Sequence, residues 1–325
     1  MDVLGIDLAK LSFDATLLQT GSSQYASFPN TPEGFTQLQA WLAQHGVKEL
    51  HACMEATNIY WEALAAWLYA QGYTVSVVNP ARIKGYAQAR MQRNKTDKLD
   101  SAIIAWFCKT HHPTAWQPLS EAHKRLRSLV RHREDLLQTQ LQQQNRLRDT
   151  TDTLVRDSLQ TVLDTIAKQL ETVERSIKQH LAAHTELRNS LHLLTAIVGI
   201  GVVTAAKLLA EFADLEQYES AKAAAADAGL TPSQFESGTS VRKRPRLSKM
   251  GKAGIRAALY WPAITAMRCC PAFKAFAARL AARGKAKKVI ICAVMRKLVH
   301  IIYGVLKHRT PYDPAKVLGR TGATT

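Results

Sequence analysis

The chain has 325 residues, and 46% of them are hydrophobic, which is enough to form the cores of two or three domains. Its formal net charge of +17 and its pI of about 9.8 favour a polyanionic partner such as nucleic acid. The five cysteines are odd in number and form no C-x-x-C pair, which argues against a disulfide framework, and the missing zinc-ligand spacing argues against a zinc centre. Apolar runs such as 289–295 are too short to span a bilayer, and the N-terminus lacks a signal-peptide pattern. We therefore expect a cytoplasmic protein with no membrane partner.

Strand and helix patterns alternate in residues 1–115 and predict an α/β domain with a mixed sheet. The first two strands follow each other closely, so we expect them to pair antiparallel. Thr31 and Pro32 are typical of an N-cap and a first helical position. Strands are expected at 3–9, 12–18, 50–55 and 73–79, and helices at 31–42, 61–68 and 97–109.

Residues 116–190 have a different pattern. From 121 to 190 there is neither Gly nor Pro, and apolar residues recur at helical spacing on both sides of a polar break near 150–157. This pattern predicts two long helices that form an antiparallel coiled-coil hairpin. Such a hairpin would be either a spacer or an assembly surface.

Residues 191–325 predict a helical domain that becomes increasingly basic. Between Val241 and Thr310 there are eighteen Lys or Arg residues and no Asp or Glu. Two apolar helices are expected around the turn G-I-G at 199–201, which is typical of a helix-hairpin-helix. The backbone N–H groups at Gly199 and Gly201 could bind a nucleic-acid phosphate, although a tight turn between two core helices would look the same.

Four carboxylates in the first domain occur in an order that indicates chemistry. Asp7 lies in the first strand, Glu55 ends a later strand, and Asp97 and Asp100 lie three residues apart at a helix start, on one face. Four such acids in one cleft would repel each other, and Mg²⁺ would make the cluster favourable. The alternative is that each acid is an ordinary strand-end or helix-dipole residue. Together they match the layout of ribonuclease-H-like nucleases.

A second candidate site lies in residues 233–252, where hydroxyl residues are followed by a basic tract. We expect a flexible loop here, and its basic residues could neutralise phosphates. Serine needs activation to act as a nucleophile, and spacing does not choose among Ser233, Ser237, Thr239, Ser240 and Ser248. The nearby basic residues are Arg242, Lys243, Arg244, Arg246, Lys249 and Lys252.

An ordered set of motifs resembles the DEDD transposases of the insertion sequence 110/1111 family. The resemblance covers nearly the whole length apart from the middle helices. It rests on V-L-G-I-D, M-E-A-T-N-I-Y, V-V-N-P, R-N-K-T-D-K-L-D, G-I-G, A-G-L-T-P, E-S-G and S-K-M-G, in that order.

The resemblance implies a RuvC-like domain at 1–115, a coiled-coil linker at 116–190 and a C-terminal transposase domain at 191–325. It implies that Asp7, Glu55, Asp97 and Asp100 hold Mg²⁺, and that Ser237 attacks DNA to form a phosphoserine link. It also implies donor and target DNA as substrates, a structured guide RNA, and a tetramer in which different subunits contribute the two sites.

Three other functions remain open from the residues alone. A hydrolytic RuvC-like nuclease such as a junction resolvase would need the four acids and not Ser237. A tyrosine recombinase could use Tyr303 or Tyr312, but its spaced Arg-His-Arg set is not evident. A non-catalytic nucleic-acid-binding scaffold would need neither the acids nor a metal ion.

Overall fold

The computed structural model describes residues 1–313 except 92–95, 214, 216–217, 238–240 and 249. For 234–237 and 241–245 it describes the backbone alone. The chain divides into two compact units, Met1–Pro118 and Leu119–Thr325. The predicted helical segment 116–190 thus falls almost wholly within the second unit.

The first unit is a five-stranded mixed sheet with helices on both faces. Its strand order is β3-β2-β1-β4-β5; β1 pairs antiparallel with β2 and parallel with β4. Each expected strand and helix of this segment is present, and β3 and α3 are additional. The elements are β1 (Asp2–Leu8), β2 (Ser12–Gln19), β3 (Ser22–Pro29), α1 (Pro32–Gln44), β4 (Leu50–Glu55), α2 (Trp61–Ala70), β5 (Thr74–Val78), α3 (Pro80–Ala89) and α4 (Asp97–His111).

Side-chain alternation along the strands divides this unit into two cores. In β1, Leu4 and Ile6 are buried in the core that includes residues of α1 and α2, whereas Val3 packs with α3 and α4. Gly5 and Asp7 have the same parity as Val3, so they face α4. The predicted cap of α1 is confirmed, since the Thr31 hydroxyl accepts a hydrogen bond from the Gly34 amide.

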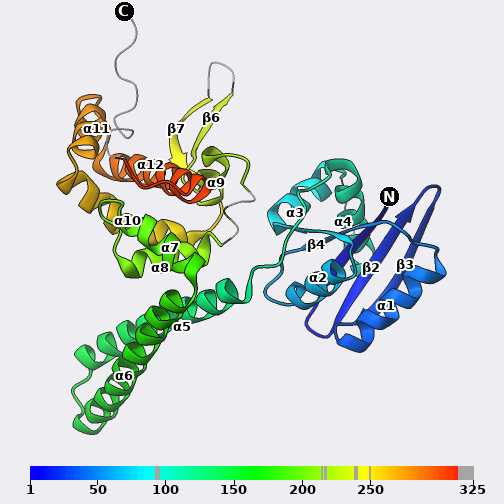
Figure 1. Cartoon of the computed structure of the whole chain (residues 1–325), viewed down its shortest axis with the longest axis horizontal. Coiled ribbons are helices and arrows are strands. Elements are labelled where there is room, and N and C mark those ends of the chain that lie inside the picture. The colour runs from blue at the N-terminus through cyan, green and yellow to red at the C-terminus, as the bar shows by residue number, and fades with distance from the viewer. Residues whose placement is uncertain (92–95, 214, 216–217, 238–240, 249, 314–325) are drawn as a thin grey trace, which may run out of the picture. The chain divides into compact units, whose positions relative to one another are not determined.

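The described residues of the second unit form helices and a β-hairpin, and the helices surround a large core. Figure 1 shows the α5–α6 pair extending from the other helices of this unit. The elements are α5 (Glu121–Asp149), α6 (Thr153–Ala183), α7 (Thr185–Thr195), α8 (Val202–Glu211), α9 (Ala221–Asp227), β6 (Pro232–Ser237), β7 (Val241–Leu247), α10 (Ala253–Cys269), α11 (Pro271–Ala282) and α12 (Lys287–His308).

Helices α5 and α6 pack against each other as an antiparallel pair. Arg133 on α5 pairs with Glu174 on α6 at 2.7 Å, and the ring of His180 lies 2.8 Å from the carbonyl oxygen of Ala122. Buried residues on α6 follow a four-three spacing, which places an apolar stripe toward α5. They are Leu159, Leu163, Ile166, Leu170, Val173 and Ile177. Two long antiparallel helices are therefore present, and coiled-coil packing stays a prediction.

One helix in the described part of the chain, α12, is long and apolar enough to cross a bilayer by length and composition. The apolar stretch of this helix is longer than the run 289–295 in the sequence indicates. Half of its apolar stretch is buried inside the protein, and Val294, Leu298 and Ile302 belong to the core of the second unit. Burial in this core accounts for its composition.

Candidate active site

Asp7 and Glu55 lie on neighbouring parallel strands, near the carboxyl ends of both. The pairing of β1 with β4 runs from Asp2 opposite Leu50 to Ile6 opposite Met54. Asp7 and Glu55 occupy the next positions along this register. Both have the strand parity that faces α4, and both side chains are half-buried. The sheet therefore brings together two acids that are 48 positions apart in the sequence.

The packing of α4 on β1 depends on a glycine. A Cβ atom at Gly5 would lie 2.2 Å from the backbone nitrogen of Ala105 and 2.2 Å from the carbonyl oxygen of Ser101. No larger residue fits while α4 keeps this position. The hydroxyls of Ser101 and Thr16 also hydrogen-bond at 2.7 Å, which links α4 to β2 inside the core. These contacts fix the N-terminal half of α4 over the sheet.

Asp97 and Asp100 lie in the first turn of α4. The Thr96 hydroxyl caps this helix by accepting a hydrogen bond from the Leu99 amide. Carboxylates at this end of a helix interact favourably with the helix dipole. Asp97 and Asp100 therefore also stabilise the start of α4, as ordinary helix-start residues would. Asp97 is exposed and Asp100 is half-buried.

The electrostatics of Asp7 connect all four predicted acids. Burial, and then the negative charges of Asp100, Glu55 and Asp97, raise the pKa of Asp7 from 3.8 to about 6. Each of these acids is thus near enough to disfavour ionisation of Asp7. Such mutual repulsion is the condition that a bound cation relieves.

The acids do not form a ready coordination sphere. Among the described residues, no three His, Cys, Asp or Glu side chains lie close enough together to ligate one metal ion. The donor set itself, carboxylate oxygens alone, fits Mg²⁺. The fold therefore brings the acids into electrostatic range, and ligation would require their side chains to turn toward a common point.

A fifth carboxylate, Asp14, lies beside this cluster and was not predicted. It is the register partner of Asp7 across β1 and β2, and it also contributes to the raised pKa of Asp7. The Tyr25 hydroxyl donates a hydrogen bond to Asp14, which raises the pKa of Tyr25 to about 12. The Lys98 ammonium lies 5.5 Å from the centre of the Tyr25 ring.

The serine region is a β-hairpin where the sequence predicts a flexible loop. Ser237 is the last residue of β6 and pairs with Val241, the first residue of β7. Gly238, Thr239 and Ser240 lie outside the described residues, as does the side chain of Ser237. The hairpin places Ser237 at the strand end next to the connection.

The predicted basic residues fall in different places. Arg242, Lys243, Arg244 and Arg246 belong to β7, and Arg246 is exposed. Lys249 lies outside the described residues. Lys252 is partly buried and makes contacts within the unit: its ammonium lies 3.4 Å from the Asp227 carboxylate and donates to the Glu211 carbonyl oxygen. Lys252 thus already makes contacts with α8 and α9.

The G-I-G turn joins α7 to α8 as the sequence predicts. Gly199 has a φ of +91°, and a Cβ there would lie 2.6 Å from the carbonyl oxygen of Pro262. Packing alone therefore explains this glycine. Gly201 is the N-cap of α8, and a Cβ there would meet nothing within 4 Å. A phosphate site at this turn stays a prediction, and Gly201 is the glycine that leaves room for it.

Comparisons with known proteins agree with the order of these features. A DEDD family profile described as Transposase matches residues 4–156, and one described as Transposase IS116/IS110/IS902 family matches residues 191–278. The first match contains all four acids, and the second contains Ser237 and the G-I-G turn.

Relatives extend the match to almost the whole chain. The pilin gene-inverting protein of Moraxella bovis is 34% identical over 313 residues, which cover 95% of this chain and 97% of that protein. The insertion element IS110 uncharacterized 43.6 kDa protein of Streptomyces coelicolor is 29% identical over 49% of this chain and 38% of its own length. The chain therefore belongs to the IS116/IS110/IS902 family of transposases, and it is a DNA transposase or recombinase.

Proposed function

We propose that this chain is an RNA-guided DNA transposase that cuts and rejoins strands through a serine ester. The four acids Asp7, Glu55, Asp97 and Asp100 form its Mg²⁺ site, and Ser237 is its nucleophile. Donor and target DNA are its substrates, and it acts in the cytoplasm on the nucleoid.

The raised pKa of Asp7 is the observation that carries the metal site. Three acids from β4 and α4 contribute to the shift, and no nearby cation among its causes offsets them. Bound Mg²⁺ would neutralise the cluster and stabilise negative charge that develops on the scissile phosphate. The strand order, with three antiparallel strands followed by two parallel ones, supports the RuvC-like assignment.

The serine chemistry balances without an external energy source. The Ser237 hydroxyl loses its proton and attacks the phosphorus of a phosphodiester, and the bond to one deoxyribose oxygen breaks. That oxygen takes up a proton and leaves as a hydroxyl. A hydroxyl from another DNA end then attacks the phosphoserine ester, which releases Ser237 and forms a new phosphodiester. Hydrolysis by water would instead lose the bond energy.

Basic residues of β7 are suited to hold the DNA backbone during these steps. The strand V-R-K-R-P-R-L carries four cations directly after the serine turn. Backbone neutralisation does not read sequence, and pairing with a guide RNA would supply that information. We propose a tetramer in which Ser237 of one subunit works with the acids of another.

A second candidate, site-specific DNA inversion, is favoured by one observation. The chain aligns with 97% of the pilin gene-inverting protein of Moraxella bovis. Inversion and insertion share the same cutting and rejoining steps. They differ in which two sites are brought together, so the same residues would carry either outcome.

Trapping the protein on DNA tests the serine mechanism directly. Wild-type protein quenched during cleavage should carry a DNA fragment on Ser237, identified by mass spectrometry. Ser237→Ala should lose both the adduct and cleavage, and Ser233→Ala is the matched control that keeps both. A Ser237→Ala protein that still cleaves DNA would be a hydrolytic RuvC-like nuclease.

A further inference from the structure

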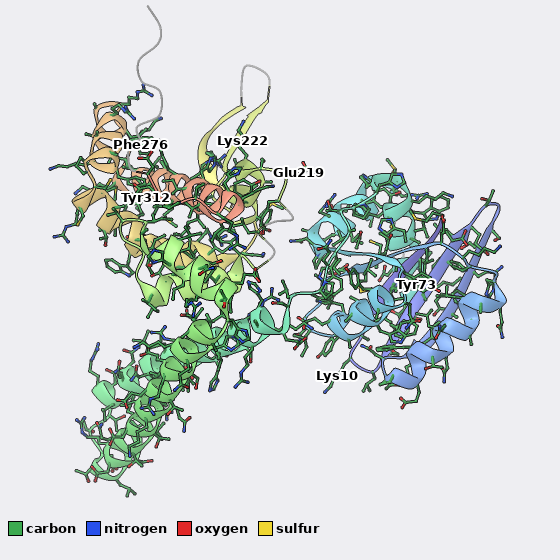
Figure 2. The ribbon with its side chains drawn as sticks, in the orientation of Figure 1. Lys10, Tyr73, Glu219, Lys222, Phe276 and Tyr312 are labelled. Carbon is green, nitrogen blue, oxygen red and sulfur yellow. The ribbon has the colours of Figure 1, made fainter. Side chains whose placement is uncertain are left out.

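A pocket of about 610 Å³ opens on α12, far along the sequence from the proposed catalytic residues. One stripe of α12 forms its floor, and the neighbouring stripe, which contains Leu298 and Ile302, is buried in the core. Figure 2 labels two aromatic residues of its wall, Phe276 on α11 and Tyr312 after α12. Its lining includes Phe276, Lys297, His300, Gly304 and Tyr312.

His300 lines this pocket, and its ring carries a hydrogen-bonding atom that is not used within the described residues. Its Nε2 atom is buried and has no hydrogen-bond partner among the residues that the structure describes. Burial, and then the charges of Arg296, Lys222 and Lys297, lower the pKa of His300, which favours the neutral ring. A buried polar atom without a partner is uncommon in folded proteins, and rotation of the His300 ring toward the pocket would let a ligand group satisfy it.

The pocket combines cations with aromatic surface. The Lys297 ammonium lies 5.1 Å from the centre of the Phe276 ring, and the Arg279 guanidinium lies 5.9 Å from the same centre. Asp313 is the one acid among the described lining residues. A ligand that fits this lining has a flat ring, polar ring edges and an adjacent negative charge.

We propose that the pocket receives one unpaired nucleotide of a nucleic-acid strand, with its base against Phe276 and Tyr312, a base edge at His300 and a phosphate at Lys297. Unpaired bases characteristically stack on aromatic side chains while Lys or Arg holds the backbone. The choice of ligand rests on the proposed function, in which guide RNA and DNA ends both present unpaired nucleotides. The volume lies within the range of small-molecule sites.

Gly304 offers a way to block the pocket without disturbing the fold. It lies within α12, and a Cβ there would meet nothing within 4 Å. Gly304→Leu should fill the space where the base lies, whereas Gly304→Ala leaves most of it open. Both replacements are good helix formers, so the pair separates blockage from folding.

The full-length protein should be titrated with a short single-stranded oligonucleotide that carries 2-aminopurine, in ribose and deoxyribose forms. Stacking should quench the fluorescence of the wild-type complex. Gly304→Leu should remove the quenching and weaken binding about tenfold, and Gly304→Ala should stay within about twofold of wild type. If Gly304→Leu removes the quenching of either oligonucleotide, the proposal is supported. The oligonucleotide that binds more tightly, ribose or deoxyribose, then shows whether the pocket receives RNA or DNA.

Two results would overturn the proposal. One is a Gly304→Leu protein with wild-type affinity and quenching in both sugar forms. The other is binding of a poly-glutamate peptide at the pocket with no quenching of either oligonucleotide, which would make it a protein-docking site. Ser237→Ala should keep the quenching while losing the covalent adduct, so failure here is distinguishable from failure of the proposed catalytic mechanism.

Discussion

Asp7 and Asp14 lie directly opposite each other on the antiparallel strands β1 and β2. Their side chains share the face of the sheet that α4 covers, and the Tyr25 hydroxyl holds Asp14 from the next strand. The carboxylates on this face thus extend from β2 through β1 to β4. Their joint effect is a stability cost that bound metal would relieve, and this cost can be measured.

Asp7→Asn should stabilise the metal-free protein at neutral pH. The pKa of Asp7 is raised to about 6, so the folded state binds its proton more tightly than the unfolded state. The stability that the folded protein gains from protonated Asp7 is fully present below pH 3.8 and is lost as the pH rises through about 6. After allowance for partial exposure, the gain in free energy of unfolding should be about 1–2 kcal/mol at pH 7.5 and near zero at pH 3.5. Urea denaturation at the two pH values measures it.

Asp14→Asn is the matched control for this prediction. It makes the same chemical change at the register partner, but Asp14 is the weakest of the charges that act on Asp7. The substitution also loses a hydrogen bond from Tyr25 to a carboxylate, so we expect no net stabilisation at pH 7.5. An equal gain in both variants would mean that the effect is general removal of negative charge.

Mg²⁺ should stabilise the wild-type protein at pH 7.5 and much less at pH 5. Protons compete with the metal for Asp7 below a pKa of about 6, and ligands must be deprotonated to bind. Thermal unfolding with and without millimolar Mg²⁺ measures the shift in Tm. Asp7→Asn should abolish the shift. Glu62→Gln, which changes an exposed acid on α2, should keep it.

Gly5→Ala should destabilise the first unit and disturb the acids together. The added Cβ would lie 2.2 Å from backbone atoms of α4, which cannot move aside like a flexible side chain. We expect a loss of about 3 kcal/mol or more and reduced cleavage even where the protein folds. Gly85→Ala on α3 is the control, since a Cβ there would meet nothing within 4 Å. It should be neutral or slightly stabilising, and equal losses in both variants would contradict the packing argument.

Strands and helices with a buried face could be predicted from the sequence because burial imposes a periodic pattern. The strand at 50–55 and the helix at 97–109 are examples. β3 was missed because most of its residues are exposed, so apolar alternation is weak. α3 was missed because it buries only Ile83. The hairpin β6–β7 was missed because charge and Pro245 disfavour a strand in the sequence pattern.

The four acids could be placed on neighbouring elements from their order, but their register could not. Whether Asp7 lies beside Glu55 depends on strand pairing across residues 9–49, which no local pattern determines. The position of Asp14 beside Asp7 could have been predicted from the sequence. Once an antiparallel hairpin is predicted at 3–18, a turn centred on residues 10 and 11 places position 14 opposite position 7.

Mixing two inactive variants should test whether the active site is shared between subunits. In the proposed mechanism Asp7→Ala removes a metal ligand and Ser237→Ala removes the nucleophile, so each alone should be inactive. If the acids of one subunit work with the serine of another, co-assembled mixtures should regain activity at roughly a quarter of the composite sites. Cleavage of a labelled DNA substrate by proteins co-expressed with two different tags, and purified through both, measures this directly.

The same experiment has a built-in control and a clear contrary outcome. Co-expressing Asp7→Ala with Glu55→Ala should restore nothing, because both changes damage the same set of acids and every composite site then contains a defective one. If the Asp7→Ala and Ser237→Ala mixture is equally inactive while the mixed assemblies form, the acids and the serine act within one subunit. Restored activity that requires both tags would instead show that a hydroxyl of one copy reaches the acids of another, since neither variant retains a complete site of its own.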